Sequence, residues 1–129
     1  MPAPVNVTTS TAAAVTDAGA SEKIVLTCAA VNVDTVQKTV AITGFLNLSP
    51  GTSATACVVR IRRNTVSGTQ VGTTESPIEV ATVSQSIPFG ATDTPGESAG
   101  LVYVVTTQNT NGSGNGTVNI IQATVIVSQ

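Results

Sequence analysis

Residues 36–48 have the sequence VQKTVAITGFLNL, in which apolar and polar side chains alternate. Val40, Ile42 and Leu46 fall on one face of an extended chain, whereas threonine and asparagine fall on the other, with Phe45 as the exception. Successive side chains of a β-strand point to opposite sides, so a period of two residues is typical of a strand with one buried face. This stretch therefore predicts a half-buried strand.

The segments on both sides of this strand show the same kind of pattern. Turn-forming residues separate them at residues 49–53 (SPGTS) and 108–116 (QNTNGSGNG, a hairpin loop), and residues 89–99 are expected to form a loop because they are rich in Gly, Pro, Asp and Ser. Further strands are expected at residues 22–33, 54–63, 69–71, 78–83, 101–107 and 117–127.

Two of these strands, at residues 101–107 and 117–127, are apolar on both faces. Such strands must lie in the centre of a sheet or have their outer face covered by another subunit, because monomers seldom expose large apolar patches. About seven to nine strands, with no helical period of comparable length, predict an all-β fold. We expect an antiparallel two-sheet sandwich that resembles a jelly roll.

The composition supports this fold class. Hydrophobic residues make up 41% of the 129 residues and charged residues only 9%, against a usual charged share of about 25%. The β-branched residues Val, Ile and Thr favour strands. We expect a single domain over residues 1–129, in which residues 1–20 form either a first strand or an arm that adds to a neighbouring sheet.

The amino terminus, MPAPVNVT, has neither a basic region nor an apolar stretch of the kind found in signal peptides. No apolar run approaches the roughly 20 residues that a membrane-spanning helix needs. These features predict a chain that is made in a cytoplasm and does not enter a membrane.

Catalytic chemistry is poorly represented in this chain. It contains no histidine, which removes the usual nucleophile–base pairs, the commonest metal ligand and the usual general base. Asp93 and Glu97 share one predicted loop and could flank a calcium ion together with backbone carbonyls. Solvated loop charges are the favoured interpretation, because the dense oxygen ligands of calcium loops are missing. We therefore expect no enzyme activity, no cofactor and no metal.

Arg60, Arg62 and Arg63 form a basic cluster on one strand. Two interpretations stay open: a solvated strand face that discourages edge aggregation, and a set of salt bridges at an interface with another protein. Nucleic acid is disfavoured as a partner, because the chain has a net charge of −2 and no aromatic stacking platform beside the arginines.

Cys28 and Cys57 both fall on the predicted inward faces of their strands. If these strands are neighbours or face each other across the core, a disulfide is feasible, because its Cα atoms must lie within about 7 Å. Buried thiols are the favoured alternative for a protein made in a cytoplasm.

Residues 57–72, CVVRIRRNTVSGTQVG, are followed by a DTPG loop at residues 93–96, by the strand of Tyr103, by a glycine-rich stretch and by a closing apolar strand. In this order, residues 22–129 resemble small jelly-roll proteins of phage particles, which are similar to trimeric modules of the tumour-necrosis-factor and C1q type. Modules of that type bury several aromatic side chains along their axis, whereas this chain has only three aromatic residues.

The resemblance implies a structural protein of the virion that is made in the host cytoplasm and either decorates or cements a capsid or forms part of a fibre. Its partners would be copies of itself, most often as a trimer, and other capsid or particle proteins. One alternative is the subunit of an extracellular filament or surface layer, in which the amino-terminal strand completes the sheet of the next subunit. Another is a glycan- or receptor-binding jelly roll, for which Phe89 is the candidate stacking residue.

Overall fold

The computed structural model of the chain describes residues 6–12, 15–16, 21–34, 39–50, 57–75, 84–109 and 116–128. Within this part of the chain there are eleven strands, and no helix that could cross a membrane is found there. The strands are β1 (Asn6–Ala12), β2 (Val15–Thr16), β3 (Lys23–Thr27), β4 (Val31–Val33), β5 (Thr39–Pro50), β6 (Cys57–Arg63), β7 (Gln70–Glu75), β8 (Gln85–Asp93), β9 (Ser98–Leu101), β10 (Tyr103–Asn109) and β11 (Gly116–Ser128).

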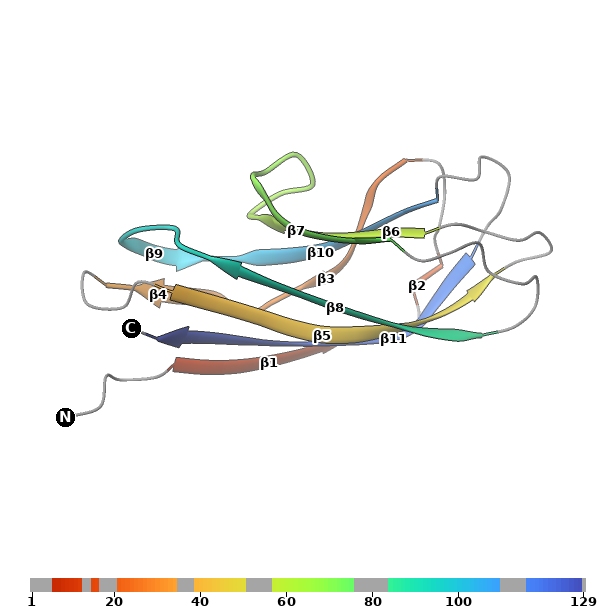
Figure 1. Cartoon of the computed structure of the whole chain (residues 1–129), viewed down its shortest axis with the longest axis horizontal. Coiled ribbons are helices and arrows are strands. Elements are labelled where there is room, and N and C mark those ends of the chain that lie inside the picture. Colours follow the sequence, from red (N-terminus) through yellow and green to blue (C-terminus); the bar gives the residue numbers. More distant parts are fainter. Residues whose placement is uncertain are drawn as a thin grey trace.

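The strands form two facing sheets and one short ribbon (Figure 1). Sheet A has the order β1-β11-β5-β8, with β2 also paired to β11, and sheet B has the order β3-β10-β6-β7. The ribbon consists of β4 and β9. Every pairing is antiparallel.

The pairing pattern is that of a jelly roll. Once the short strands β2, β4 and β9 are set aside, the first of the remaining strands pairs with the last (β1 with β11), the second with the second to last (β3 with β10), and so on inward through β5 with β8 and β6 with β7. This is the arrangement of one long hairpin rolled up into two sheets. The predicted all-β sandwich is thereby confirmed, and the three short strands explain why there are more strands than expected.

The core lies between the inner faces of the two sheets. On β5 the alternating residues Val40, Ile42, Leu46 and Leu48 are fully buried, as their spacing predicts. The two strands with apolar residues on both faces are central: β11 lies between β1 and β5, and β10 lies between β3 and β6. Central strands are paired along both edges, so the backbone groups of β10 and β11 find their partners within the chain.

The two sheets approach each other closely along the edges formed by β7 and β8. A Cβ atom added to Gly72 of β7 would lie 2.6 Å from the Cβ atom of Ala91 on β8. Real Cβ atoms do not approach other carbon atoms so closely, so this contact requires a glycine at position 72.

The prediction of a loop at residues 89–99 was wrong for most of these residues. Residues 85–93 form β8, and residues 98–101 form β9. Ile87 and Phe89 point into the core at alternate positions, a strand signal that the Gly and Pro content concealed. Pro88 is tolerated because β8 is an edge strand of sheet A, where a missing N–H donor can face away from the ladder.

The other predicted segments differ in how well they agree with the structure. The strand predicted at residues 22–33 is broken into β3 and β4, and the one predicted at residues 78–83 lies outside the described residues. The glycine-rich stretch at residues 108–116 was expected to close a hairpin, but β10 and β11, which flank it, belong to different sheets. Residues 6–12 form a first strand that pairs with β11 of the same chain.

Candidate functional site

One buried carboxylate joins the two sheets. Asp93, at the end of β8 in sheet A, is only 7% exposed. Its Oδ2 atom accepts hydrogen bonds from the hydroxyl of Tyr103 at 2.7 Å and from Nε of Arg63 at 2.8 Å, and its Oδ1 atom accepts one from Nη2 of Arg63 at 2.5 Å. Arg63 and Tyr103 belong to sheet B, so we call this set the inter-sheet pin.

The electrostatics of the inter-sheet pin fix its protonation state. Burial raises the pKa of Asp93, but the hydrogen bonds from Arg63 and Tyr103 outweigh it and leave the pKa below the ordinary value. Burial and the hydrogen bond to Asp93 raise the pKa of Tyr103 far above its ordinary value. The carboxylate is therefore charged and the phenol neutral at neutral pH. Both Asp93 oxygens are engaged, so this group serves to hold the sheets together and offers no base for catalysis.

The favoured interpretation of Asp93 as a solvated loop charge was wrong, because this residue lies at the end of β8 and is 7% exposed. The calcium interpretation of Asp93 and Glu97 is not supported either, because the carboxylate of Asp93 is directed at Arg63 and Tyr103. Within the described residues, no group of three or more His, Cys, Asp or Glu side chains is placed to hold a metal ion.

A second charged cluster covers the outer face of sheet B. Glu22 accepts hydrogen bonds at 2.7 Å from Nη1 of Arg60 and from Nε of Arg62, and a third at 3.1 Å from Nη2 of Arg62. Arg60 also donates to Oε1 of Gln108 at 2.7 Å, and Arg62 donates to the backbone oxygen of Gly68 at 2.9 Å. We call these residues the Glu22 cluster.

In the Glu22 cluster, burial raises the pKa of Glu22, but the hydrogen bonds and charges of Arg62 and Arg60 lower it below the ordinary value overall. The arginine stems lie beside Val104 and Thr106, which are opposite Arg62 and Arg60 in the ladder and are buried although they share the outer face.

The predicted cluster of three arginines thus divides into two networks. Arg60 and Arg62 meet on Glu22, while Arg63 belongs to the inter-sheet pin. All three make ion pairs within the chain, so an interface role for them stays a prediction and would use only their remaining donors. The sequence placed Arg60 and Arg62 on one strand face, but nothing in it pointed to Glu22, which lies 38 and 40 residues away from them in the chain.

The two cysteines lie at opposite ends of β10. The backbone N–H of Cys28 donates to the oxygen of Tyr103, whereas Cys57 is opposite Asn109 in the ladder. At about 3.3 Å per residue, the six residue steps between these positions span roughly 20 Å, far beyond the reach of a disulfide. The intrachain disulfide considered from sequence is therefore wrong, and both residues are buried thiols. Burial raises the pKa of Cys28 to about 11.

The predicted glycan contact at Phe89 was also wrong. Phe89 is 6% exposed and packs into the core, opposite Gly44 in the ladder. A Cβ atom at Gly44 would lie 2.7 Å from Cζ of Phe89, so the glycine makes room for the ring. An enclosed ring has no free face on which a sugar could stack.

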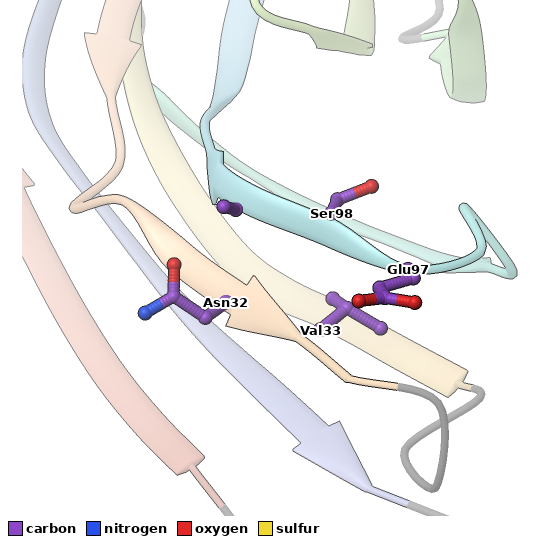
Figure 2. A pocket seen from close by; sticks show the side chains of 5 residues that line it. Asn32, Val33, Glu97 and Ser98 are labelled. Carbon is purple, nitrogen blue, oxygen red and sulfur yellow. The ribbon is translucent and has the colours of Figure 1, made fainter.

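A shallow depression of about 460 Å³ lies at the ribbon of β4 and β9 (Figure 2). Asn32, Val33, Glu97, Ser98 and Ala99 line it. The Oδ1 atom of Asn32 already accepts a hydrogen bond from the backbone N–H of Gly100 at 2.8 Å. This depression offers a single carboxylate and no aromatic ring, so it lacks the convergent polar groups and apolar walls of ligand sites.

The outer faces of the two sheets differ in charge. Sheet B carries the Glu22 cluster, whereas the outward residues that the structure describes on sheet A are all uncharged. We call this second surface the uncharged face. On β5 and β8 it consists of Thr39, Ala41, Thr43, Phe45, Asn47, Ser49, Ser86, Pro88, Gly90 and Thr92.

The comparisons with known proteins show the fold alone. No protein-family model and no curated protein matches the chain. Among solved structures, a chain of the infectious bursal disease virus Gt strain matches with a TM-score of 0.61 and 14% identity, covering 96% of this chain and 32% of the viral chain. The VP2 protein of the same virus, in T=1 particles, matches with a TM-score of 0.57 and 12% identity, over 97% of this chain and 36% of VP2. This chain thus spans about a third of the viral chains that it matches.

A third similar structure comes from Bacillus endospore appendages, described as disulfide-linked pili. Its TM-score is 0.54 and its identity 19%, and the match covers 99% of this chain and 91% of the pilus chain. Similarity thus extends over a whole pilus subunit but over only part of a capsid protein.

Proposed function

We propose that this chain is a structural protein of a virus particle, which acts by packing against other protein surfaces. The observation that carries the proposal is a jelly roll with one uncharged outer face and one charged outer face. Low-charge sheet faces suit burial between subunits, because each buried charge would need a partner. The fold similarity to capsid proteins of infectious bursal disease virus supports the same role.

A non-catalytic role is consistent with the state of the ionisable groups. The carboxylates of Asp93 and Glu22 are held by arginines, and the phenol of Tyr103 is held neutral by Asp93. Ion pairs with arginine lower the pKa of these carboxyl groups. Such groups make poor general acids and bases, because catalysis needs a pKa near the working pH.

The finer role that we propose is a decoration or cement protein on the capsid surface. Such a protein needs at least one surface that packs against neighbouring subunits and one that meets solvent, and the two outer faces of this sandwich differ in that way. Its partners would be copies of itself and other capsid proteins, and the trimer implied by the sequence resemblance stays part of the proposal.

Immunogold electron microscopy tests this function directly. Antibodies raised against the purified chain should label the heads of virus particles released from cells that produce it. A pre-immune serum serves as the control. Label on filaments, or on neither kind of assembly, would contradict the virion role.

A second candidate, the subunit of an extracellular filament, is favoured by the match over nearly the whole length of a pilus chain. Linkage would then rest on packing or on addition of β1 to a neighbouring sheet, because Cys28 and Cys57 are buried at 2% and 0% exposure and are not placed to bond between subunits. Deletion of residues 2–15 should abolish such polymerisation and leave a folded monomer. Filaments that form without these residues would argue against strand addition.

A further inference from the structure

Phe45 stands out on the uncharged face of sheet A. It is 41% exposed, and it lies on β5 between Gln122 of β11 and Pro88 of β8. In the described part of the chain, the other large hydrophobic side chains with comparable exposure are Ile24 and Val66, at 39% and 38%. Of the three, only Phe45 lies at the middle of a broad sheet face, whereas Ile24 lies on the edge strand β3 and Val66 in the turn between β6 and β7.

We infer that the uncharged face is the contact surface for the same face of a second copy of this chain, with Phe45 at its centre. This inference rests on the proposed function, because it names one of the surfaces through which the subunit would assemble. The occupant is identified by charge and by area.

The absence of charged side chains on the described part of the uncharged face limits which partner surfaces can cover it. A charged partner surface would lose its water there and find no opposite charge, so its desolvation would not be compensated by an ion pair. The partner must therefore be uncharged too. Sheet B does not qualify, because Glu22, Arg60 and Arg62 lie over its outer face. Among the described sheet faces, the matching surface is the uncharged face of another copy.

The area of the uncharged face follows from the spacing and length of its strands. Strands lie about 4.8 Å apart and rise about 3.4 Å per residue, so the strands of sheet A present a face of roughly 650 Å². A stable interface buries about 800 Å² on each partner. Side chains that project from the sheet add to the flat area, so this face is of the size that a specific contact requires. An aromatic residue at its centre occupies the position where binding energy concentrates.

A contact between two identical faces has two-fold symmetry. It gives dimers if the subunit is otherwise a monomer, and hexamers if three-fold contacts through other surfaces form a trimer. An even number of copies is expected in both cases, with the smaller assembly having about twice the mass of the 12.9 kDa chain.

The test is light scattering after size-exclusion chromatography, combined with sedimentation equilibrium to obtain the dissociation constant. The test variants are Phe45→Glu and Thr43→Glu, both at exposed positions of the uncharged face. Ile24→Glu is the matched control, because Ile24 has almost the same exposure on the other sheet. Thermal unfolding of each variant shows that it is folded.

We expect the wild type and Ile24→Glu to form the even-numbered assembly. Phe45→Glu should raise its dissociation constant at least about thirtyfold, as for a residue at an interface centre, and Thr43→Glu should raise it in the same direction. If the Phe45→Glu variant assembles with the same dissociation constant as the wild type, this inference is overturned. Self-assembly, and with it the proposed function, would remain intact. A wild type that stays monomeric at about 1 mM, where even a contact with a dissociation constant of about 1 mM would form dimers in part, would also overturn it. Immunogold label on virus heads would in that case leave the proposed virion role intact.

Discussion

The hydroxyl of Tyr103 donates a hydrogen bond of 2.7 Å to Asp93 across the two sheets of the sandwich. Arg63 binds both oxygens of the same carboxylate, so one charged group of sheet A is held by two residues of sheet B. Such a network specifies how the sheets are aligned, because its geometry is satisfied in one arrangement only.

The first prediction concerns this hydrogen bond. Tyr103→Phe removes the hydroxyl and leaves Arg63 as the main partner of a carboxylate that stays buried. We expect a loss of about 2 kcal/mol in the free energy of unfolding, as for a hydrogen bond to a charged group. Urea unfolding followed by circular dichroism measures it. An unchanged midpoint would mean that the bond contributes nothing to the free energy of unfolding.

The second prediction concerns acid. The pKa values of Asp93 and Glu22 are lowered in the folded chain, so the folded state holds these protons less tightly than the unfolded state. Their contribution to stability is complete above the ordinary carboxyl pKa of about 4 and is lost as pH falls through the lower folded values. We expect the free energy of unfolding to decline below about pH 4.5.

The control for the acid prediction is Glu22→Gln. This variant cannot titrate at position 22, so its stability should decline less steeply with acid than that of the wild type. Equal slopes in the two proteins would show that the Glu22 cluster does not perturb the carboxyl group.

The third prediction concerns the thiol of Cys28. Burial raises its pKa to about 11 from an ordinary 9.0, so at pH 8 it holds about a hundredfold less thiolate than an exposed cysteine. Reaction with a chromogenic disulfide reagent should be at least that much slower in the folded chain than in urea. The Cys57→Ser variant isolates this residue. The raised pKa also means that the stability contributed by Cys28 is present below pH 9 and is lost as pH rises toward 11.

The fourth prediction separates the two phenylalanines. Phe89→Ala should lower the free energy of unfolding by about 3–5 kcal/mol, because it opens a cavity in the core beside Gly44. For the dissociated subunit, Phe45→Ala should change it by less than about 1 kcal/mol, because in the single chain this side chain is 41% exposed and lies outside the core. Chemical unfolding of both variants measures the difference. A small effect at Phe89 would place this ring outside the core.

The sequence predicted those parts of the fold in which polarity follows the strand period. Val40, Ile42 and Leu46 marked the inner face of β5, and Phe45 marked its outer face. β8 was missed because Pro88 and Gly90 are typical of loops, and only an edge position with close sheet contacts makes them suitable for a strand.

The candidate sites were harder to predict, because their partners are distant in the chain. Asp93 looked like a loop carboxylate until β8 brought it to Tyr103 and Arg63. Phe89 looked like a surface ring for the same reason. Single-sequence patterns report the face on which a residue lies, but the pairing of Glu22 with Arg60 and Arg62 follows from the order of strands in sheet B, which local patterns do not encode.

The position of β11 has a consequence for how the protein is made. This strand leaves the ribosome after the other ten, yet it occupies the middle of sheet A between β1 and β5. Before β11 is synthesised, the strand that pairs with both β1 and β5 is missing. Translation must therefore pass residue 116 before these strands of sheet A can be joined. Folding of this sandwich is therefore expected to await the synthesis of β11 (Gly116–Ser128), with slow, long-range strand pairing as its last step.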